Sequence, residues 1–213
     1  MSRGTTSIDP RIERSRAAII PAAIETFLAN GYQATNVDEI AAAARVSKRT
    51  IYNIFGDKER LFREIIAETF AAAEAFSSEV AESLVATDDI RATLEAAAIQ
   101  LAAIVLSDRV MRLRRLLIGE AERFPELASE YYARAPGRVI SVIAGAFEDL
   151  GNRGLLQIDD PLLAAEQFAY LVVGAQIDRA LFHTQRLAPS DDDITARARY
   201  GVATFLKAHQ PDR

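Results

Sequence analysis

Apolar residues recur with the period of an α-helix along almost the whole chain, and this feature constrains the fold more than any other. Ile12, Ile19, Ala23 and Phe27, for example, are spaced so that they share one face of a helix. No segment sustains the alternation of apolar and polar residues that marks a half-buried strand. The pattern predicts an all-α protein of about nine helices.

Residues that start or stop helices divide the chain between these apolar stripes. Asn30-Gly31 is expected to end the first helix, and Pro21 inside it is expected to produce a kink. Thr35 and Ser47 are the expected N-caps of two short helices at 36–44 and 48–54. The remaining helices are expected at 58 into the eighties, 89–106, 109–123, 126–151 with a break near Pro136-Gly137, 160–186 and 191–208.

The composition excludes several classes of protein. There is no cysteine, which rules out disulfides, thiolate metal sites and cysteine catalysis. The longest uncharged stretches have 12 residues, too few for a helix that spans a bilayer. The N-terminal segment MSRGTTSIDP lacks the apolar run of a signal peptide. We therefore expect a cytoplasmic protein without a membrane partner.

Charge is unevenly distributed along the chain. Residues 1–60 hold nine Lys and Arg against seven Asp and Glu, a net charge of +2. The whole chain has a net charge of −5, so the remainder carries −7. A locally basic N-terminal part on an acidic body suits a protein that binds phosphate at one place without general affinity for nucleic acid. A difference this small can also arise by chance.

Residues 36–54 have the outline of a helix-turn-helix, in which two short helices follow a longer one. The second helix of that motif enters the major groove of DNA and presents its N-terminal residues to base edges. Lys48, Arg49 and Asn53 carry suitable donors for guanine and adenine, while Ile51 and Phe55 occupy the inward face. An ordinary solvated helix carries similar residues, so the spacing alone leaves both interpretations open.

A longer set of residues resembles the N-terminal signature of the TetR family of transcription factors over about residues 11–62. The matching positions are Phe27, Gly31-Tyr32, Thr35, Ile40-Ala41, Ala44, Val46-Ser47-Lys48, Thr50-Ile51-Tyr52, Phe55, Lys58-Glu59 and Leu61. The resemblance implies a homodimer that binds a near-palindromic operator in double-stranded DNA. It also implies a repressor that a small-molecule effector releases from that operator.

The resemblance places a set of side chains at the DNA: Thr35, Ser47, Lys48, Arg49, Thr50, Tyr52, Asn53 and Lys58. Lys48, Arg49 and Asn53 would face bases, whereas Thr35, Tyr52 and Lys58 would mainly hold phosphates. The chain departs from the family at Arg45, where most members have glycine in the turn. Arg45 either adopts a left-handed conformation at a cost on the order of 1 kcal/mol or marks a less demanding turn. It can also add a phosphate contact.

The rest of the chain resembles the family more weakly. Leu113–Arg115, Glu120–Leu127 and Tyr131-Tyr132 resemble the C-terminal domain of the AefR-like subgroup. The expected domains are a flexible arm at 1–9, a DNA-binding domain at 10–57, a ligand-binding and dimerisation domain at 58–208 and a tail at 209–213. No cofactor is expected.

Two further surfaces are expected in the second domain. A ligand cavity needs large apolar walls with few polar groups, and the candidates are Phe70, Phe76, Ile104, Leu113, Leu117, Glu120, Phe124, Tyr132, Phe147, Phe168, Gln176 and Phe182. A dimer seam needs helices with an extra apolar face, and the candidates are Leu171, Ala175, Phe182, Ile194, Ala198, Gly201, Val202 and Phe205. Core packing within one chain is the alternative in both cases.

Two other functions remain open. No Walker loop, Gly-x-Ser-x-Gly elbow or His-Glu-x-x-His motif occurs, and His183 and His209 are far apart in sequence. An enzyme would therefore depend on scattered carboxylates. A dimeric ligand-binding protein without operator function would keep the dimer and the ligand pocket but would have lost DNA binding, and the intact Lys48–Lys58 segment argues against it. No catalytic or metal site is assigned, because Asp191–Asp193 is better explained as the acidic first turn of the last helix.

Overall fold

The computed structural model describes residues 9–87, 89–182 and 189–211, and every regular element in these ranges is a helix. The elements are α1 (Pro10–Ala34), α2 (Val37–Ala44), α3 (Lys48–Phe55), α4 (Lys58–Val85), α5 (Ile90–Val105), α6 (Asp108–Gly119), α7 (Pro125–Arg134), α8 (Pro136–Asn152), α9 (Pro161–Ala169), the π-helix η1 (Tyr170–Gly174), α10 (Ala175–Phe182) and α11 (Asp191–His209). The all-α class is confirmed. Within these ranges, counting α7 with α8 and α9 with η1 and α10 as single broken helices gives the expected nine.

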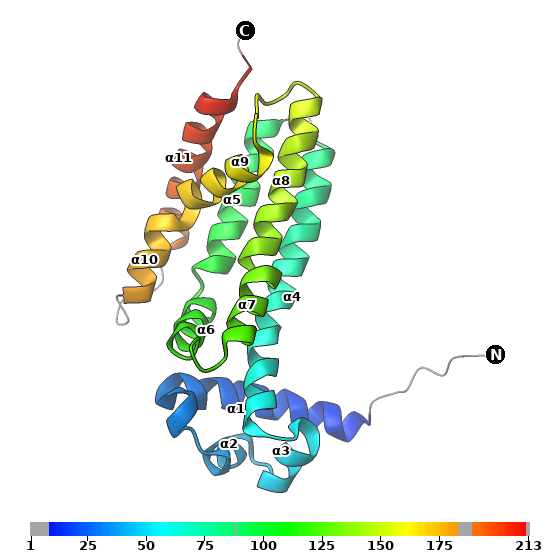
Figure 1. Ribbon diagram of the computed structural model, residues 1–213, viewed down its shortest axis with the longest axis vertical. Coiled ribbons are helices and arrows are strands. Elements are labelled where there is room, and N and C mark those ends of the chain that lie inside the picture. Colours follow the sequence, from blue (N-terminus) through cyan, green and yellow to red (C-terminus); the bar gives the residue numbers. More distant parts are fainter. Residues whose placement is uncertain (1–8, 88, 183–188, 212–213) are drawn as a thin grey trace, which may run out of the picture.

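The helices form a small head and a long body (Figure 1). The head consists of α1, α2 and α3, and α4 leaves it and continues along the body (Figure 1). In the body, α8 packs along α4 and α9, and α11 packs along α5 and η1. Because α4 belongs to both parts, a displacement of this helix in the body also moves its end in the head.

No single helix in the described ranges has both the length and the hydropathy of a membrane span. Among the described residues, one pair of helices, Ile90–Val105 and Asp108–Gly119, reaches this length and hydropathy when the two are taken together. The two helices are bent by 57° relative to each other.

Side-chain caps fix the beginnings of the two short head helices. Ser47 accepts a hydrogen bond from the backbone N–H of the third helical residue of α3, as expected. The expectation that Thr35 caps α2 is wrong, because Asn36 holds that position and accepts from a backbone N–H in the first turn. Thr35 is instead buried, and its hydroxyl donates to the carbonyl of Gly31 at 2.6 Å.

The irregular residue in α1 is Gly31 rather than Pro21. Gly31 has φ 75° and ψ 171°, a conformation that favours glycine, and one further turn follows it to Ala34. The sequence correctly placed the interruption at Asn30-Gly31. The kink expected at Pro21 does not appear in the backbone torsion angles, which remain helical there.

The helix expected at 160–186 is divided by the π-helix η1, which was not predicted from the sequence. Its expected last residues, including His183, lie outside the described residues. Gly201 of α11 lies against this segment, since a β-carbon there would be 3.0 Å from the carbonyl oxygen of Leu171. Gly201 therefore allows α11 to cross η1 at close range, and it belongs to this contact rather than to a dimer seam.

Three phenylalanines fill the space between α8, α9 and α11. The ring centroids of Phe147, Phe168 and Phe205 lie 4.9 to 5.6 Å apart, and all three side chains are at most 1% exposed. Phe147 and Phe168 are thus core residues rather than cavity walls. Phe205 is a core residue rather than part of a dimer seam.

The apolar face of α11 is buried within its own chain, which corrects the predicted dimer seam. The misassigned residues are Ile194, Ala198, Gly201, Val202 and Phe205, which pack with α11 against α5 and η1. The candidates that do remain exposed are Leu171, Ala175 and Phe182. On α11 the exposed large apolar side chain is Tyr200, at 80%.

The last helix begins with the acidic turn that the sequence predicted. Ser190 caps α11, and Asp191–Asp193 form its first turn, where carboxylates oppose the positive end of the helix dipole. At the other end, the ring of His209 lies 4.4 Å from that of Phe205, and its Nδ1 is 3.0 Å from the carbonyl oxygen of Gln157. His209 is therefore packed against the body, although it was assigned to the tail.

Candidate nucleic-acid interface and ligand cavity

α3 presents a polar outer face at the end of the head. Ile51 and Phe55 are buried and anchor the helix against α1 and α2, as predicted. Lys48, Arg49 and Asn53 are exposed on the other side of the same helix. This division leaves their donor groups accessible to the edges of bases, although contact with DNA stays a prediction.

Hydroxyl groups surround the N-terminus of α3. The Ser47 and Thr50 hydroxyls lie 2.8 Å apart, and Tyr52, two residues after Thr50, is 40% exposed. The first N–H groups of a helix attract anions, because they lack intrahelical partners and lie at the positive end of the dipole. A phosphate at this helix end would therefore find both N–H and O–H donors.

Lys48 is held by an acidic neighbour in this conformation. Its ammonium donates a hydrogen bond of 2.9 Å to Asp38 at the start of α2, and this bond raises the pKa of Lys48. Both side chains are exposed, so the pair is weak and screened by salt. Lys48 stays charged, and contact with a base requires it to leave Asp38.

Lys58 does not face outward as a phosphate-binding residue. Its ammonium donates to the carbonyl oxygens of Tyr32, Gln33 and Thr35 at 2.9, 3.3 and 3.0 Å and lies 4.6 Å from the centre of the Tyr32 ring. A cation is favourable at these carbonyls, because they lie at the negative end of a helix. The phosphate contacts expected of Lys58 and of the buried Thr35 are therefore wrong for this conformation.

Arg45 occupies the turn between α2 and α3 in the left-handed conformation, with φ 55° and ψ 41°. It is the one described non-glycine residue with positive φ. Of the two alternatives that the sequence left open, the strained turn is the one found. Its side chain is exposed beside α3, where a contact with phosphate stays a prediction.

Arg45→Gly is expected to raise the free energy of unfolding by about 1 kcal/mol, because glycine adopts this conformation without a β-carbon clash. Arg45→Ala is the matched control, since it removes the guanidinium but keeps the β-carbon. Urea denaturation followed by circular dichroism measures both variants. Equal stability of the glycine and alanine variants would show that the turn is not strained.

An aromatic cluster joins the head to the body. Tyr32 of α1 and Phe124, which precedes α7, have ring centroids 4.8 Å apart, and Phe62 of α4 lies 5.0 and 5.5 Å from them. The Arg123 guanidinium lies 5.3 Å from the centre of the Tyr32 ring. Burial raises the pKa of the Tyr32 hydroxyl, so this group stays neutral. Phe124, a cavity candidate from sequence, belongs to this junction instead.

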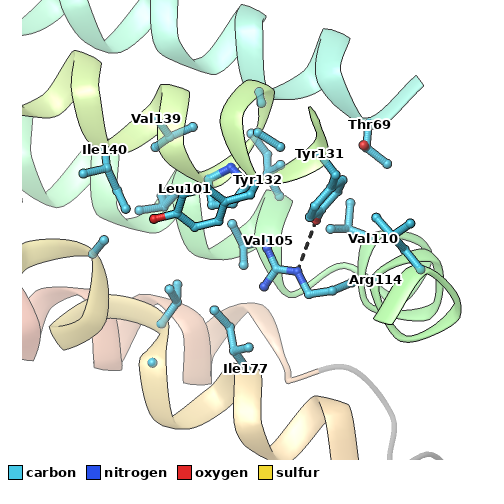
Figure 2. A pocket seen from close by; sticks show the side chains of 18 of the residues that line it. Thr69, Leu101, Val105, Val110, Arg114, Tyr131, Tyr132, Val139, Ile140 and Ile177 are labelled. Atoms are coloured by element: carbon cyan, nitrogen blue, oxygen red, sulfur yellow. Dashed lines mark hydrogen bonds between the residues drawn. The ribbon is translucent and has the colours of Figure 1, made fainter. Parts of the chain in front are cut away.

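A cavity of about 570 Å³ opens among the helices of the body (Figure 2). This volume lies in the range of about 300–1,000 Å³ that is typical of small-molecule sites. Its walls come from α4, α5, α6, α7, α8 and the α9–η1–α10 segment, and they are largely apolar. Representative wall residues are Leu101, Val105, Val139, Ile140 and Ile177 (Figure 2).

The structure places one third of the cavity candidates in this wall. Phe76, Ile104, Leu117 and Tyr132 line the cavity. The candidates that lie elsewhere are Phe70, Leu113, Glu120, Phe124, Phe147, Phe168, Gln176 and Phe182. Phe70 and Leu113 are enclosed in the core, Glu120 follows the end of α6, and Gln176 donates to the carbonyl of Val172 one turn before it.

The charged groups of the cavity were not among the residues predicted from the sequence. Arg114 of α6 donates from Nε to the Tyr131 hydroxyl at 3.2 Å (Figure 2). Glu166 and Asp178 line it from α9 and α10, and both are exposed. A signal for Arg114 was present, because it lies three residues before Leu117 and so shares its helical face.

Comparison with known proteins relates both parts of the chain to one class. Residues 19–65 match the family described as bacterial regulatory proteins, tetR family, and residues 92–211 match the C-terminal domain of AefR-like transcriptional repressors. A crystal structure from Mesorhizobium loti MAFF303099, assigned to the TetR family, is 32% identical with a TM-score of 0.84. That similarity covers 95% of this chain and 100% of the other.

Two further similarities point the same way. The flavonoid-responsive regulator FrrA is 31% identical with a TM-score of 0.70, over 94% of this chain and 100% of FrrA. The uncharacterized HTH-type transcriptional regulator YhgD of Bacillus subtilis is 49% identical over 47 residues, which are 22% of this chain and 25% of YhgD. Alignments with such curated relatives span only 25% to 38% of their lengths.

Proposed function

The chain belongs to the TetR family of bacterial transcriptional regulators, and from that premise we propose that it is an operator-binding repressor released from DNA by a small, largely apolar ligand. The observation that carries the proposal is one helix, α4, that links an exposed polar helix in the head to a cavity in the body. The proteins that it resembles are transcriptional regulators rather than enzymes.

DNA recognition depends on the outer face of α3. Arg49 and Asn53 supply the donor groups that match guanine and adenine in the major groove. Lys48 joins them once it leaves Asp38, and Arg45, Ser47, Thr50 and Tyr52 bind the flanking phosphates. All of these residues except the half-buried Thr50 are exposed, which supports the proposal.

The functional unit is a homodimer that places two heads on successive half-sites of a near-palindromic operator. Its seam is formed by the exposed apolar side chains of Leu163, Leu171 and Tyr200, on α9, η1 and α11. Two helical segments from each chain then build a four-helix bundle across the twofold axis. Ala175 and Phe182, which are exposed on α10, extend the same face.

The direct test uses DNA from the neighbourhood of the gene. A fragment that carries an inverted repeat beside the gene should be retarded in a native gel, while a scrambled fragment of equal length should not. Competition with unlabelled DNA of both kinds measures the specificity. Failure to distinguish inverted repeats from scrambled DNA would favour a dimeric ligand-binding protein without operator function.

Ligand-induced release is expected to depend on the junction between head and body. Leu117 lines the cavity, and the segment that follows α6 ends at Phe124, which packs against Tyr32 of the head. Phe124→Leu should therefore reduce the factor by which a ligand lowers operator affinity, from about tenfold to a hundredfold towards unity. The ligand is a hit from a thermal-shift screen of hydrophobic compounds, titrated into the protein–operator complex.

Phe147→Leu is the matched control for this experiment. Phe147 is fully buried in the body, away from the junction, so the substitution removes similar packing without touching the head. It should leave the coupling factor unchanged. The same loss of coupling in both variants would mean that general loosening, and not the junction, controls release.

A further inference from the structure

We propose that the ligand of this cavity is an apolar molecule that bears a single oxyanion, such as a carboxylate, sulfonate or phenolate, and that Arg114 binds this group. The inference rests on the proposed function, because it names the chemical class of effector for the same cavity. Arg114 is half-buried in α6 and lines the cavity beside Tyr131 and Val105 (Figure 2).

The guanidinium of Arg114 has unused donor capacity. It carries five N–H groups, of which Nε–H donates to the Tyr131 hydroxyl at 3.2 Å. For the terminal amino groups, the described part of the chain provides neither a hydrogen bond nor a carboxylate within 4.0 Å. These amino groups are not among the buried side-chain atoms without a partner, so they stay accessible, and a ligand oxygen can accept charge-assisted hydrogen bonds from them.

The other arginines of α6 differ from Arg114 in this respect. Arg109 pairs with a glutamate of α4, and Arg112 pairs with Glu25 of α1 at 3.5 Å. Arg115 donates to the main-chain carbonyl of Ala180 at 2.6 Å. Arg114 is the arginine of this helix that lines the cavity, and its partner there, the Tyr131 hydroxyl, is a neutral group.

The charges around the cavity favour an anion over a cation. Arg114 is half-buried, whereas the two acids of the lining, Glu166 and Asp178, are exposed on α9 and α10. Water and salt screen exposed charges, while a charge in a partly desolvated wall acts over the same distance with greater strength. Arg114 is therefore the least screened charge of the lining, and a cationic ligand would be repelled there.

The remaining walls require an apolar body for the ligand. Phe76, Leu101, Ile104, Val139 and Ile177 belong to the apolar lining of the same cavity. An apolar ring system or chain removes these surfaces from water, whereas a small hydrophilic anion would leave them unfilled. Binding at Arg114 also acts on α6, the helix that contacts α1 of the head.

Two dyes with the same rings test the proposal on the full-length protein. Anilinonaphthalene sulfonate carries the oxyanion, and N-phenylnaphthylamine is its neutral counterpart. Both fluoresce in apolar sites, and only the binding that Leu117→Trp abolishes is counted as cavity binding. Arg114→Met should lower the affinity for the sulfonate dye about tenfold to a hundredfold. The affinity for the neutral dye should change by no more than about twofold, because methionine keeps the apolar stem.

Arg109→Met is the matched control, since Arg109 lies on the same helix but does not line the cavity. Arg109→Met should leave the affinity for both dyes unchanged. If Arg114→Met does not fold, Arg114→Gln also removes the cation, and the ratio of the two dye affinities can be measured on that variant instead. The proposal would be overturned if Arg114→Met left the ratio of the two dye affinities unchanged, for example through equal losses of affinity for both. It would also be overturned if the sulfonate dye did not bind in the cavity of the wild type.

The same samples distinguish this inference from the proposed function. Retardation of the inverted-repeat fragment by the wild type and by Arg114→Met tests operator binding without ligand. Loss of retardation in the wild type refutes the proposed function, while the ratio of dye affinities still decides the ligand class. Intact retardation with an unchanged ratio refutes the ligand class alone.

Discussion

Leu171→Glu is expected to convert a homodimer of about twice 23.3 kDa into monomers that bind the operator at least about a hundredfold more weakly. Leu171 is 44% exposed on η1, next to the place where α11 crosses, and the proposed seam would bury it against the partner. A carboxylate in an apolar seam would have no partner, which strongly disfavours association. A monomer occupies one half-site and loses the tethering that strengthens binding to the second.

Leu155→Glu is the matched control for the dimer prediction. Leu155 is a leucine of similar exposure, 39%, in the segment between α8 and α9 and outside the proposed seam. It should leave the mass and the operator affinity unchanged. Light scattering after gel filtration gives the mass, and titration of an inverted-repeat fragment gives the affinity. A Leu171→Glu protein that stays dimeric would place the seam elsewhere.

Local features of the fold were predictable because their causes lie within a few residues. Ser47 caps α3 with its own hydroxyl, and Gly31 interrupts α1 with a positive φ. The break between α7 and α8 falls at Pro136, as its missing N–H and restricted backbone require. Even here, neighbouring residues compete for one cap position, since Asn36 and not Thr35 caps α2.

Features that depend on distant partners were not predictable in this way. The period of α11 correctly identified Ile194, Ala198 and Val202 as buried, but not what buries them, which is α5 and η1 of the same chain. Periodicity shows a face and not its partner. For the same reason, Phe147 and a true wall residue such as Leu117 look alike in sequence, because a cavity is defined by several helices together.

Arg49→Ala and Asn53→Ala are each expected to lower affinity for the operator by about 2–6 kcal/mol, since both halves of a symmetric dimer lose a base contact of about 1–3 kcal/mol. Both residues are exposed on α3, while Ile51 and Phe55 hold the helix in place, so alanine should not disturb the fold. Binding to operators with single base changes should show that each variant no longer discriminates at one position per half-site.

Lys58→Met provides the contrast that separates recognition from architecture. The sequence assigned Lys58 to phosphate, and a lost phosphate contact would lower the salt dependence of binding by about one unit per subunit. In the structure its ammonium instead binds three carbonyls at the end of α1. Lys58→Met should therefore lower the melting temperature of the protein. It should also reduce the affinity for all DNA sequences equally and leave the salt dependence of binding unchanged. If the variant showed a shallower salt dependence of DNA binding at normal stability, Lys58 would contact phosphate in the complex. The head would then have to rearrange on DNA.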